Sequence, residues 1–183
     1  MLVQIAELLI LNAFGLIVYA LLLRFYMQVL RAPFRNPVGM FVTAITNWIV
    51  LPVRRVIPGL LGIDLATILL AWVLEALMVT LLLWLHSTNL SNAPGAAAGL
   101  LFGIAAIKIL EASLYLLFGV VVLHVLLSWL NPHTPISPLL DALTRPFYRI
   151  FQRFIPPVGS VDLSPLFVLL CVQILLFLIP KFS

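Results

Sequence analysis

The sequence predicts an all-helical membrane protein with four transmembrane helices, arranged as two parallel tandem repeats. Of its 183 residues, 64% are hydrophobic and only 9% are charged. Soluble domains carry about 45–50% apolar and about 25% charged residues. A chain of this length has too little interior to withdraw that much apolar surface from water. The apolar residues also gather in four runs near the roughly 20 residues that a membrane-spanning helix needs. A water-soluble enzyme domain is therefore excluded.

The first half holds two of these runs, at 8–30 and 63–85. The segment between them, 31–62, is rich in proline and arginine, which predicts a break between two spans. No basic segment precedes the first run, and Glu7 is the first charged residue. That pattern does not resemble a cleavable signal peptide, so we expect the first run to stay in place as a span.

The second half repeats this order, with spans expected at 99–130 and 161–179 after a short linker at 88–98. A helix over 99–130 would be roughly 48 Å long at 1.5 Å per residue, against a hydrocarbon core of about 30 Å. We therefore expect this helix to tilt or to project beyond the membrane. The segment between the two spans, 131–160, is again basic and proline-rich.

The two basic segments match each other when the sequence is shifted by 98 positions. Residues 37–65 then fall on 135–163 without a gap, with eight identities in 29 positions. The identical pairs are Pro37/Pro135, Ala44/Ala142, Thr46/Thr144, Arg55/Arg153, Ile57/Ile155, Pro58/Pro156, Asp64/Asp162 and Leu65/Leu163. This match predicts a tandem duplication, with a first repeat at 1–87 and a second at 99–183. Because each repeat has two spans, both start on the same side and are parallel.

Charge predicts the orientation. Seven arginines lie in the two segments between spans, whereas the opposite side has only the amino terminus, Glu7, an uncharged turn and Lys181. The positive-inside rule places the basic segments in the cytoplasm and both termini outside. The net charge of +4 is explained by this topology and by anionic lipid, so we expect the lipid bilayer rather than nucleic acid as a partner.

The segment 137–157 has the pattern of an amphipathic helix kinked at Pro146. Its apolar face holds Leu139, Leu140, Leu143, Phe147, Ile150, Phe151 and Phe154, and its charged stripe holds Asp141, Arg145, Arg149 and Arg153. In one interpretation the helix lies at the membrane interface, with Arg145 and Arg149 at lipid headgroups and Arg54 in the same role in the first repeat. In the other, the helix packs on the spans and its arginines are only solvated.

Two aspartates stand at the head of a span. Asp64 and Asp162 can accept hydrogen bonds from the free amides of the first helical turn and complement the helix dipole. Each can also pair with the arginine nine residues earlier, Arg55 or Arg153. Both roles are compatible, and we expect capping to be the larger contribution.

Four charged residues fall inside predicted spans: Arg24, Glu75, Lys108 and Glu111. Such residues are costly in hydrocarbon and usually face the bundle and pair. Lys108 and Glu111 are three apart and can pair on one helix face. An ion or proton path is the alternative, but Glu75 aligns with Gln173 and Lys108 with Ile10, which favours a structural role.

Groups for catalysis are scarce. The chain has one cysteine, Cys171, and three dispersed histidines, His86, His124 and His133. It contains no zinc-binding HExxH pattern, no phosphate-binding loop and no nucleophile-elbow motif. We therefore expect a protein that is not an enzyme and that binds no metal or cofactor.

The second repeat resembles the YggT family of bacterial and plastid membrane proteins. The carrying residues are Ser128-Trp129, then the run 143–147 (LTRPF), the run 153–157 (RFIPP) and the run 161–165 (VDLSP). The first repeat is similar through Asn36-Pro37, the run 54–58 (RRVIP) and the run 62–65 (GIDL). The Arg, Pro-Pro and Asp-Leu-Ser-Pro order is the specific part of the resemblance.

The resemblance implies a protein of the bacterial inner membrane with no assigned catalytic residues. Members of the family are linked to osmotic-stress tolerance and to division-associated gene neighbourhoods. Two functions remain open. The duplicated basic segments favour a non-enzymatic scaffold or assembly factor that binds other membrane proteins. The charged residues within spans favour a small ion channel or transporter, which would require self-association because four spans make a narrow bundle.

Overall fold

A computed structural model describes residues 1–57, 59, 64–86, 94–153 and 162–179. These residues form helices and no strand, which confirms the all-α prediction. The helices are α1 (Leu2–Val29), α2 (Pro37–Val56), α3 (Leu65–Leu85), α4 (Pro94–Leu130), α5 (Ser137–Gln152) and α6 (Ser164–Leu178).

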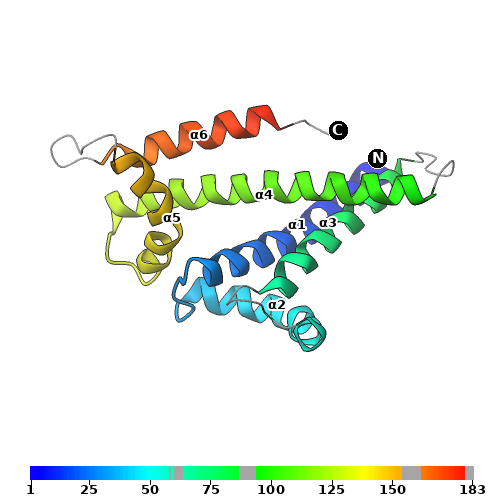
Figure 1. The fold of residues 1–183 in the computed structure, drawn as a ribbon, viewed down its shortest axis with the longest axis horizontal. Coiled ribbons are helices and arrows are strands. Elements are labelled where there is room, and N and C mark those ends of the chain that lie inside the picture. Colours follow the sequence, from blue (N-terminus) through cyan, green and yellow to red (C-terminus); the bar gives the residue numbers. More distant parts are fainter. Residues whose placement is uncertain (58, 60–63, 87–93, 154–161, 180–183) are drawn as a thin grey trace.

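Each half of the chain places a crossing helix between two longer ones. Figure 1 shows α1 and α3 side by side with α2 across their ends, and α4 beside α6 with α5 across the end of α4. The halves meet mainly where α3 packs on α4, and α1 also contacts α4 and α5. Among the described residues, α6 contacts only α4 and α5. The same order of elements in both halves is what the repeat predicts.

The four described helices that are long and apolar enough to cross a membrane differ in one case from the four predicted spans. By length and composition they are α1, α2, α3 and α4. The predicted last span, 161–179, is the shorter α6 of 15 residues, about 22 Å long. The helix α2, which lies in the predicted basic segment, is the least apolar of the four and ends in Arg54 and Arg55. By length and composition, α2 is therefore a candidate span and α6 is not.

The junction between α1 and α2 is fixed by specific local contacts. The amides of Arg31 and Ala32 donate to the carbonyls of Gln28 and Met27, which closes α1 with a Schellman motif. Asn36 then caps α2 by accepting from the amide of Gly39 at 2.9 Å. A Cβ at position 39 would overlap the carbonyl of Phe34, so this site requires glycine. These contacts set the angle at which α2 crosses α1.

The apolar face of α5 packs on other helices. Leu139 and Leu143 are buried against Met27 at the end of α1, and Tyr148 is buried with Val121 of α4 and Val168 of α6. Phe147 and Phe151 are half-buried beside Tyr148, and Phe154 lies outside the described residues. For the apolar face, this packing agrees with the second interpretation, because the face meets the helix bundle; contact of Arg145 and Arg149 with lipid headgroups stays a prediction.

Candidate functional site

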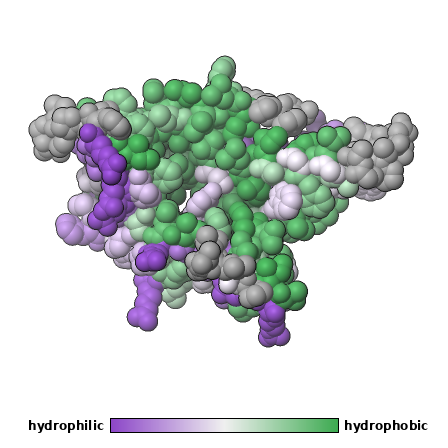
Figure 2. Space-filling view, viewed as in Figure 1, coloured by the Kyte–Doolittle hydropathy of each residue, from purple (hydrophilic) through white to green (hydrophobic). Residues whose placement is uncertain are grey.

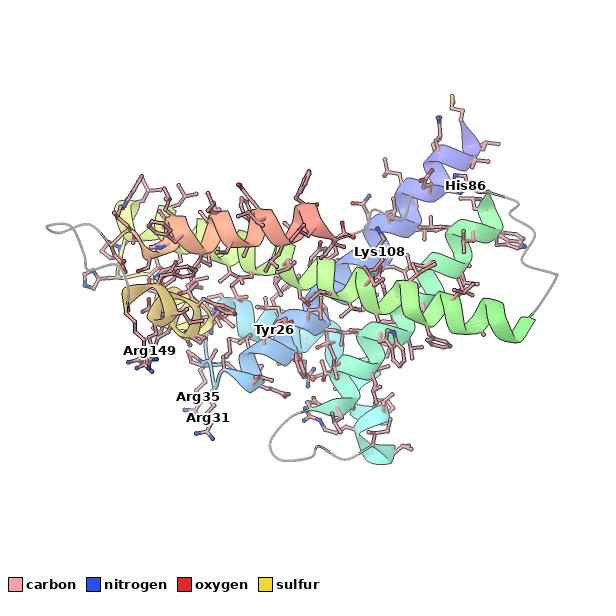
Figure 3. All side chains as sticks on the ribbon, turned by 45° about the horizontal axis from the view of Figure 1, so that its top comes forward. Tyr26, Arg31, Arg35, His86, Lys108 and Arg149 are labelled. Carbon is pink, nitrogen blue, oxygen red and sulfur yellow. The ribbon has the colours of Figure 1, made fainter. Side chains whose placement is uncertain are left out.

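One side of the molecule carries the exposed positive charge, which we call the basic end. Figure 2 shows strongly hydrophilic side chains at the left end and along the lower edge of a largely hydrophobic surface. In Figure 3, Arg31, Arg35 and Arg149 project from neighbouring elements. The exposed arginines of the basic end are Arg31, Arg35, Arg55, Arg145, Arg149 and Arg153. Within the described part of the chain, none of their guanidinium groups makes a hydrogen bond or an ion pair.

Asp64 binds the arginine next to the predicted one. Arg54, not Arg55, donates to Asp64 Oδ2, and the Thr67 hydroxyl donates to the same oxygen at 2.6 Å. Asp64 occupies the N-cap position of α3 and is only 4% exposed, but its side chain makes no capping hydrogen bond with a helix amide. The expectation that capping is the larger contribution is therefore wrong for Asp64, whose bonds come from the side chains of Arg54 and Thr67. Burial by itself would raise the pKa of Asp64, but the hydrogen bonds from Arg54 and Thr67 outweigh it and hold the pKa below its ordinary value.

This contact corrects two predictions. Arg55 is exposed and does not pair with Asp64. Arg54 was predicted at lipid headgroups, but its guanidinium is bound to the carboxylate at the head of α3. Pro58 and Pro156, the prolines of the repeated motif, lie outside the described residues.

The second repeat forms the corresponding contact without an ion pair. Gln152, 98 positions after Arg54, donates its amide to Asp162 Oδ2 at 2.9 Å. The backbone amide of Ser164, the first residue of α6, donates to Asp162 Oδ1 at 2.9 Å. Burial tends to raise the pKa of Asp162, yet the bonds from Ser164 and Gln152 hold it below its ordinary value. Arg153, the predicted partner, makes no pair with Asp162.

Substitution of Asp162 should separate capping from charge. Asp162→Asn keeps an oxygen that can accept from the Ser164 amide, so we expect only a small loss of stability. Asp162 lies one residue before the N-cap Leu163, and Asp162→Ala removes the acceptor for the Ser164 amide, which should cost about 0.5–1.5 kcal/mol. Thermal unfolding of the detergent-solubilised variants measures both, and equal losses for Asn and Ala would contradict a capping role.

Arg24 joins α1 to α2. It is 5% exposed and donates through one terminal nitrogen to Thr46 Oγ1 at 2.6 Å and to Asn47 Oδ1 at 2.8 Å. Its Nε has no partner among the described residues. Arg24 was one of the charged residues predicted inside a span. It bonds neutral oxygens of the crossing helix α2 and not an acidic residue of another span.

His124 takes the corresponding place between α4 and α5. Its Nε2 lies 2.8 Å from Asp141 Oδ1, and its Nδ1 lies 3.1 Å from Thr144 Oγ1 and 3.2 Å from the hydroxyl of Tyr148. The His124 and Tyr148 rings stack, and burial raises the pKa of Tyr148 to about 12, so its hydroxyl stays neutral. Sequence reasoning missed this network, although the alignment of Thr46 with Thr144 marked its position.

Two open hollows lie beside these contacts. One, of about 520 Å³, is lined by Arg31, Arg54, Asp64 and Gln28 among others. The other, of about 600 Å³, is lined by residues of the His124 network together with Arg145, Arg149 and Gln152. Both combine arginines, which can bind anionic groups, with hydrogen-bonding groups and one carboxyl group, Asp64 in the first hollow and Asp141 in the second.

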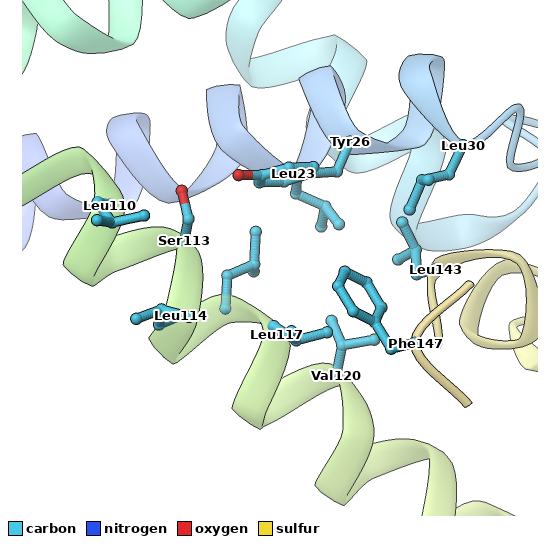
Figure 4. Close-up of a pocket in the computed structure, with 11 residues that line it drawn as sticks. Leu23, Tyr26, Leu30, Leu110, Ser113, Leu114, Leu117, Val120, Leu143 and Phe147 are labelled. Atoms are coloured by element: carbon cyan, nitrogen blue, oxygen red, sulfur yellow. The ribbon is translucent and has the colours of Figure 1, made fainter. Parts of the chain in front are cut away.

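A smaller cavity lies deeper between α1, α4 and α5. It measures about 170 Å³ and is lined almost wholly by apolar side chains, with the hydroxyl groups of Tyr26 and Ser113 as its polar exceptions (Figure 4). Such a lining offers mainly shape and apolar contact.

The remaining predicted polar residues lie where α1, α3 and α4 meet. Lys108 Nζ and Glu111 Oε2 are 3.2 Å apart on α4, as their spacing predicts. Glu75, at the middle of α3, is 4% exposed. Within the described ranges, no group of three or more histidine, cysteine or acidic side chains is placed to hold a metal ion.

Comparison with known proteins identifies the family. The family model described as CCB3/YggT matches residues 3–85 and 103–182. This two-part match suits a chain with two family units; the exact boundaries at 87 and 99 stay a prediction. No solved structure matches the chain.

Three bacterial relatives are similar along most of their length. An uncharacterized protein encoded in the proC 3' region of Vibrio alginolyticus is 34% identical over 93% of this chain and 90% of its own. An uncharacterized protein of Pseudomonas aeruginosa is 32% identical over 84% of this chain and 77% of its own. The uncharacterized protein YggT of Escherichia coli K12 is 32% identical over 85% of this chain and 78% of its own.

Proposed function

The chain belongs to the CCB3/YggT family, and from this premise we propose that it is a non-enzymatic scaffold or assembly factor of the bacterial inner membrane. One observation carries the proposal: the six exposed arginines of the basic end lie on or beside the crossing helices and have no partner within the described residues. A guanidinium in this state is a ready donor to phosphate or carboxylate groups.

The proposed placement puts α1, α3, α4 and α6 across the membrane and α2 and α5 at its cytoplasmic face. The polar contacts of Arg24 and His124 join the two crossing helices to the bundle. The exposed arginines are then presented to lipid phosphates and to the acidic surface of a protein partner. Each arginine near an anionic membrane surface contributes about 1 kcal/mol.

The backbone of Arg31 supports a functional role for its side chain. Arg31 has a φ of 53°, a left-handed conformation that costs a residue other than glycine roughly 1–2 kcal/mol. Glycine is the usual residue at this position of a Schellman motif. We infer that the arginine is kept for its charge despite this cost.

Arg31→Gly should therefore raise stability while weakening binding. We expect a gain of about 0.5–1 kcal/mol in the free energy of unfolding, because the strain disappears but glycine loses more entropy on folding. Anionic lipid co-purified per protein, measured by mass spectrometry, should fall. A glycine variant that is less stable than the wild type would contradict this account.

Co-purification in mild detergent tests the scaffold function. We expect wild-type protein to carry a second membrane protein in a defined ratio, and the triple variant Arg145→Gln, Arg149→Gln, Arg153→Gln to lose it. The matched triple lysine variant keeps the charge and should retain most of the partner. A purely self-associated protein, with no second chain, would contradict the scaffold.

Reporter fusions test the proposed topology. Fusions at Pro94 and after residue 183 should both report the external side, because seven arginines hold the opposite side in the cytoplasm. A cytoplasmic signal from either fusion would overturn the assignment.

A second function is favoured by the charged residues of α3 and α4. Glu75, Lys108 and Glu111 lie within helices proposed to span the membrane, where ionisable groups often mark ion pathways. A small oligomeric channel or transporter that acts in osmotic stress would use them. Ion flux into liposomes that contain the purified protein would support it over the scaffold.

A further inference from the structure

Glu75 is a buried residue of α3 whose carboxyl group has no bonding partner within the described residues. Its side chain is 4% exposed and it stands at the middle residue of α3, ten residues from each end. At 1.5 Å per residue, this places it about 15 Å from either end of the helix. Within the described part of the chain it makes no hydrogen bond and no ion pair. A buried charge in this state would be costly in a membrane-spanning bundle.

The groups around Glu75 come from α1 and α4. Lys108 and Glu111 of α4 lie close enough to act on it electrostatically, and so does the hydroxyl of Tyr19 on α1, which also interacts with Tyr115. Lys108 is already bound to Glu111 at 3.2 Å. In Figure 3, Lys108 lies where α4 crosses α1. The cluster therefore holds two carboxyl groups and one ammonium group, and full ionisation would leave one surplus negative charge.

We propose that Glu75 is an exchangeable proton-binding site whose bound proton cancels the surplus charge of the Glu75–Lys108–Glu111 cluster. A proton fits better than a metal ion, because no set of three acidic, histidine or cysteine side chains surrounds this point in the described residues. The hydroxyl of Tyr19 can accept or donate a hydrogen bond beside this cluster, but it cannot supply the missing positive charge.

This site does not depend on the scaffold function, which rests on the exposed arginines of the basic end and not on Glu75. For the transporter function, the site would supply a position in the middle of the membrane at which a moving proton can bind. Liposome flux tests the transporter, whereas proton occupancy can be measured without any flux, so the two can fail separately.

Infrared difference spectroscopy of the reconstituted protein tests the proposal. The carbonyl stretch of a protonated carboxylic acid should be present near neutral pH and should shift in D₂O. It should disappear in Glu75→Gln, which resembles the protonated form and is expected to fold. The control Glu7→Gln removes a half-exposed carboxyl group next to His86 and should leave the band unchanged. Lys108→Met removes the only ammonium of the cluster and should double the band.

Three outcomes would overturn the proposal. One is a wild-type protein without the band throughout the pH range of about 5 to 8 in which physiological proton switches work. Another is a band of wild-type intensity in Glu75→Gln. The third is a band that falls when sodium is added at constant pH, which would place a metal cation where we place the proton.

Discussion

Arg54→Ala is expected to lower the free energy of unfolding by about 2–3 kcal/mol. The substitution leaves the carboxylate of Asp64, 4% exposed at the head of α3, without its cation. Removing one partner of a fully buried pair costs about 3–5 kcal/mol, and we expect less here because Arg54 itself is 39% exposed. Denaturant unfolding in detergent measures the loss.

The second repeat supplies the matched control. Gln152→Ala removes the corresponding donor to Asp162, but Asp162 is exposed and keeps its bond from Ser164. We expect a loss below about 1 kcal/mol. Similar losses for Arg54→Ala and Gln152→Ala would show that the ion pair of the first repeat stabilises the fold no more than the neutral hydrogen bond of the second.

The same pair predicts a change in acid sensitivity. The pKa of Asp64 is held below its ordinary value in the folded protein, so its contribution to stability is present above the unfolded pKa of about 3.9 and is lost as pH falls through the folded pKa. In Arg54→Ala the effect of burial, which raises the pKa, remains with less opposition. The variant should therefore lose less stability on acidification than the wild type, and a steeper loss would contradict the pairing.

Arg24→Met is the second substitution with a large expected effect. It removes two charge-assisted hydrogen bonds, to Thr46 and Asn47, that tie α1 to α2. Such bonds contribute about 1.5–3 kcal/mol each, but the methionine avoids the cost of burying a charge. We expect a net loss of about 2–3 kcal/mol, measured as for Arg54→Ala.

Two further variants check the role of Arg24. Arg24→Lys keeps the charge but lacks the planar group that reaches two oxygens, so its loss should be smaller than that of methionine. Asn12→Ala alters an exposed side chain of the same helix, bonded to the Leu8 carbonyl, and should change stability by less than about 0.5 kcal/mol. A methionine variant as stable as Asn12→Ala would mean that Arg24 does not fasten α2.

Much of the fold could be predicted from the sequence because runs of apolar residues and prolines mark helices and their breaks directly. The helix α3 was predicted at 63–85 and begins at Leu65, directly after Asp64. The shift of 98 positions also pairs Thr46 with Thr144, and each of these bonds a cationic or titratable side chain from the preceding helix.

The partner of each aspartate could not be read from spacing. Neighbouring residues on a helix point about 100° apart, so Arg54 and Arg55 face different directions and only one can reach Asp64. Pro52 inside α2 makes that direction hard to derive from the pattern alone. The environment of the α5 apolar face was ambiguous for another reason, because lipid tails and neighbouring helices are equally apolar.

Crosslinking in living cells from residue 149 tests the scaffold account most directly. In one variant, a photo-reactive amino acid replaces the exposed Arg149 on α5. In a second variant of the same chain, it replaces the exposed Leu170 on α6. The account predicts an adduct with a different membrane protein from position 149, its loss when Arg145 and Arg153 are changed to glutamine, and no such adduct from position 170. Adducts only between copies of this chain, or a partner adduct that survives loss of the arginines, would contradict it.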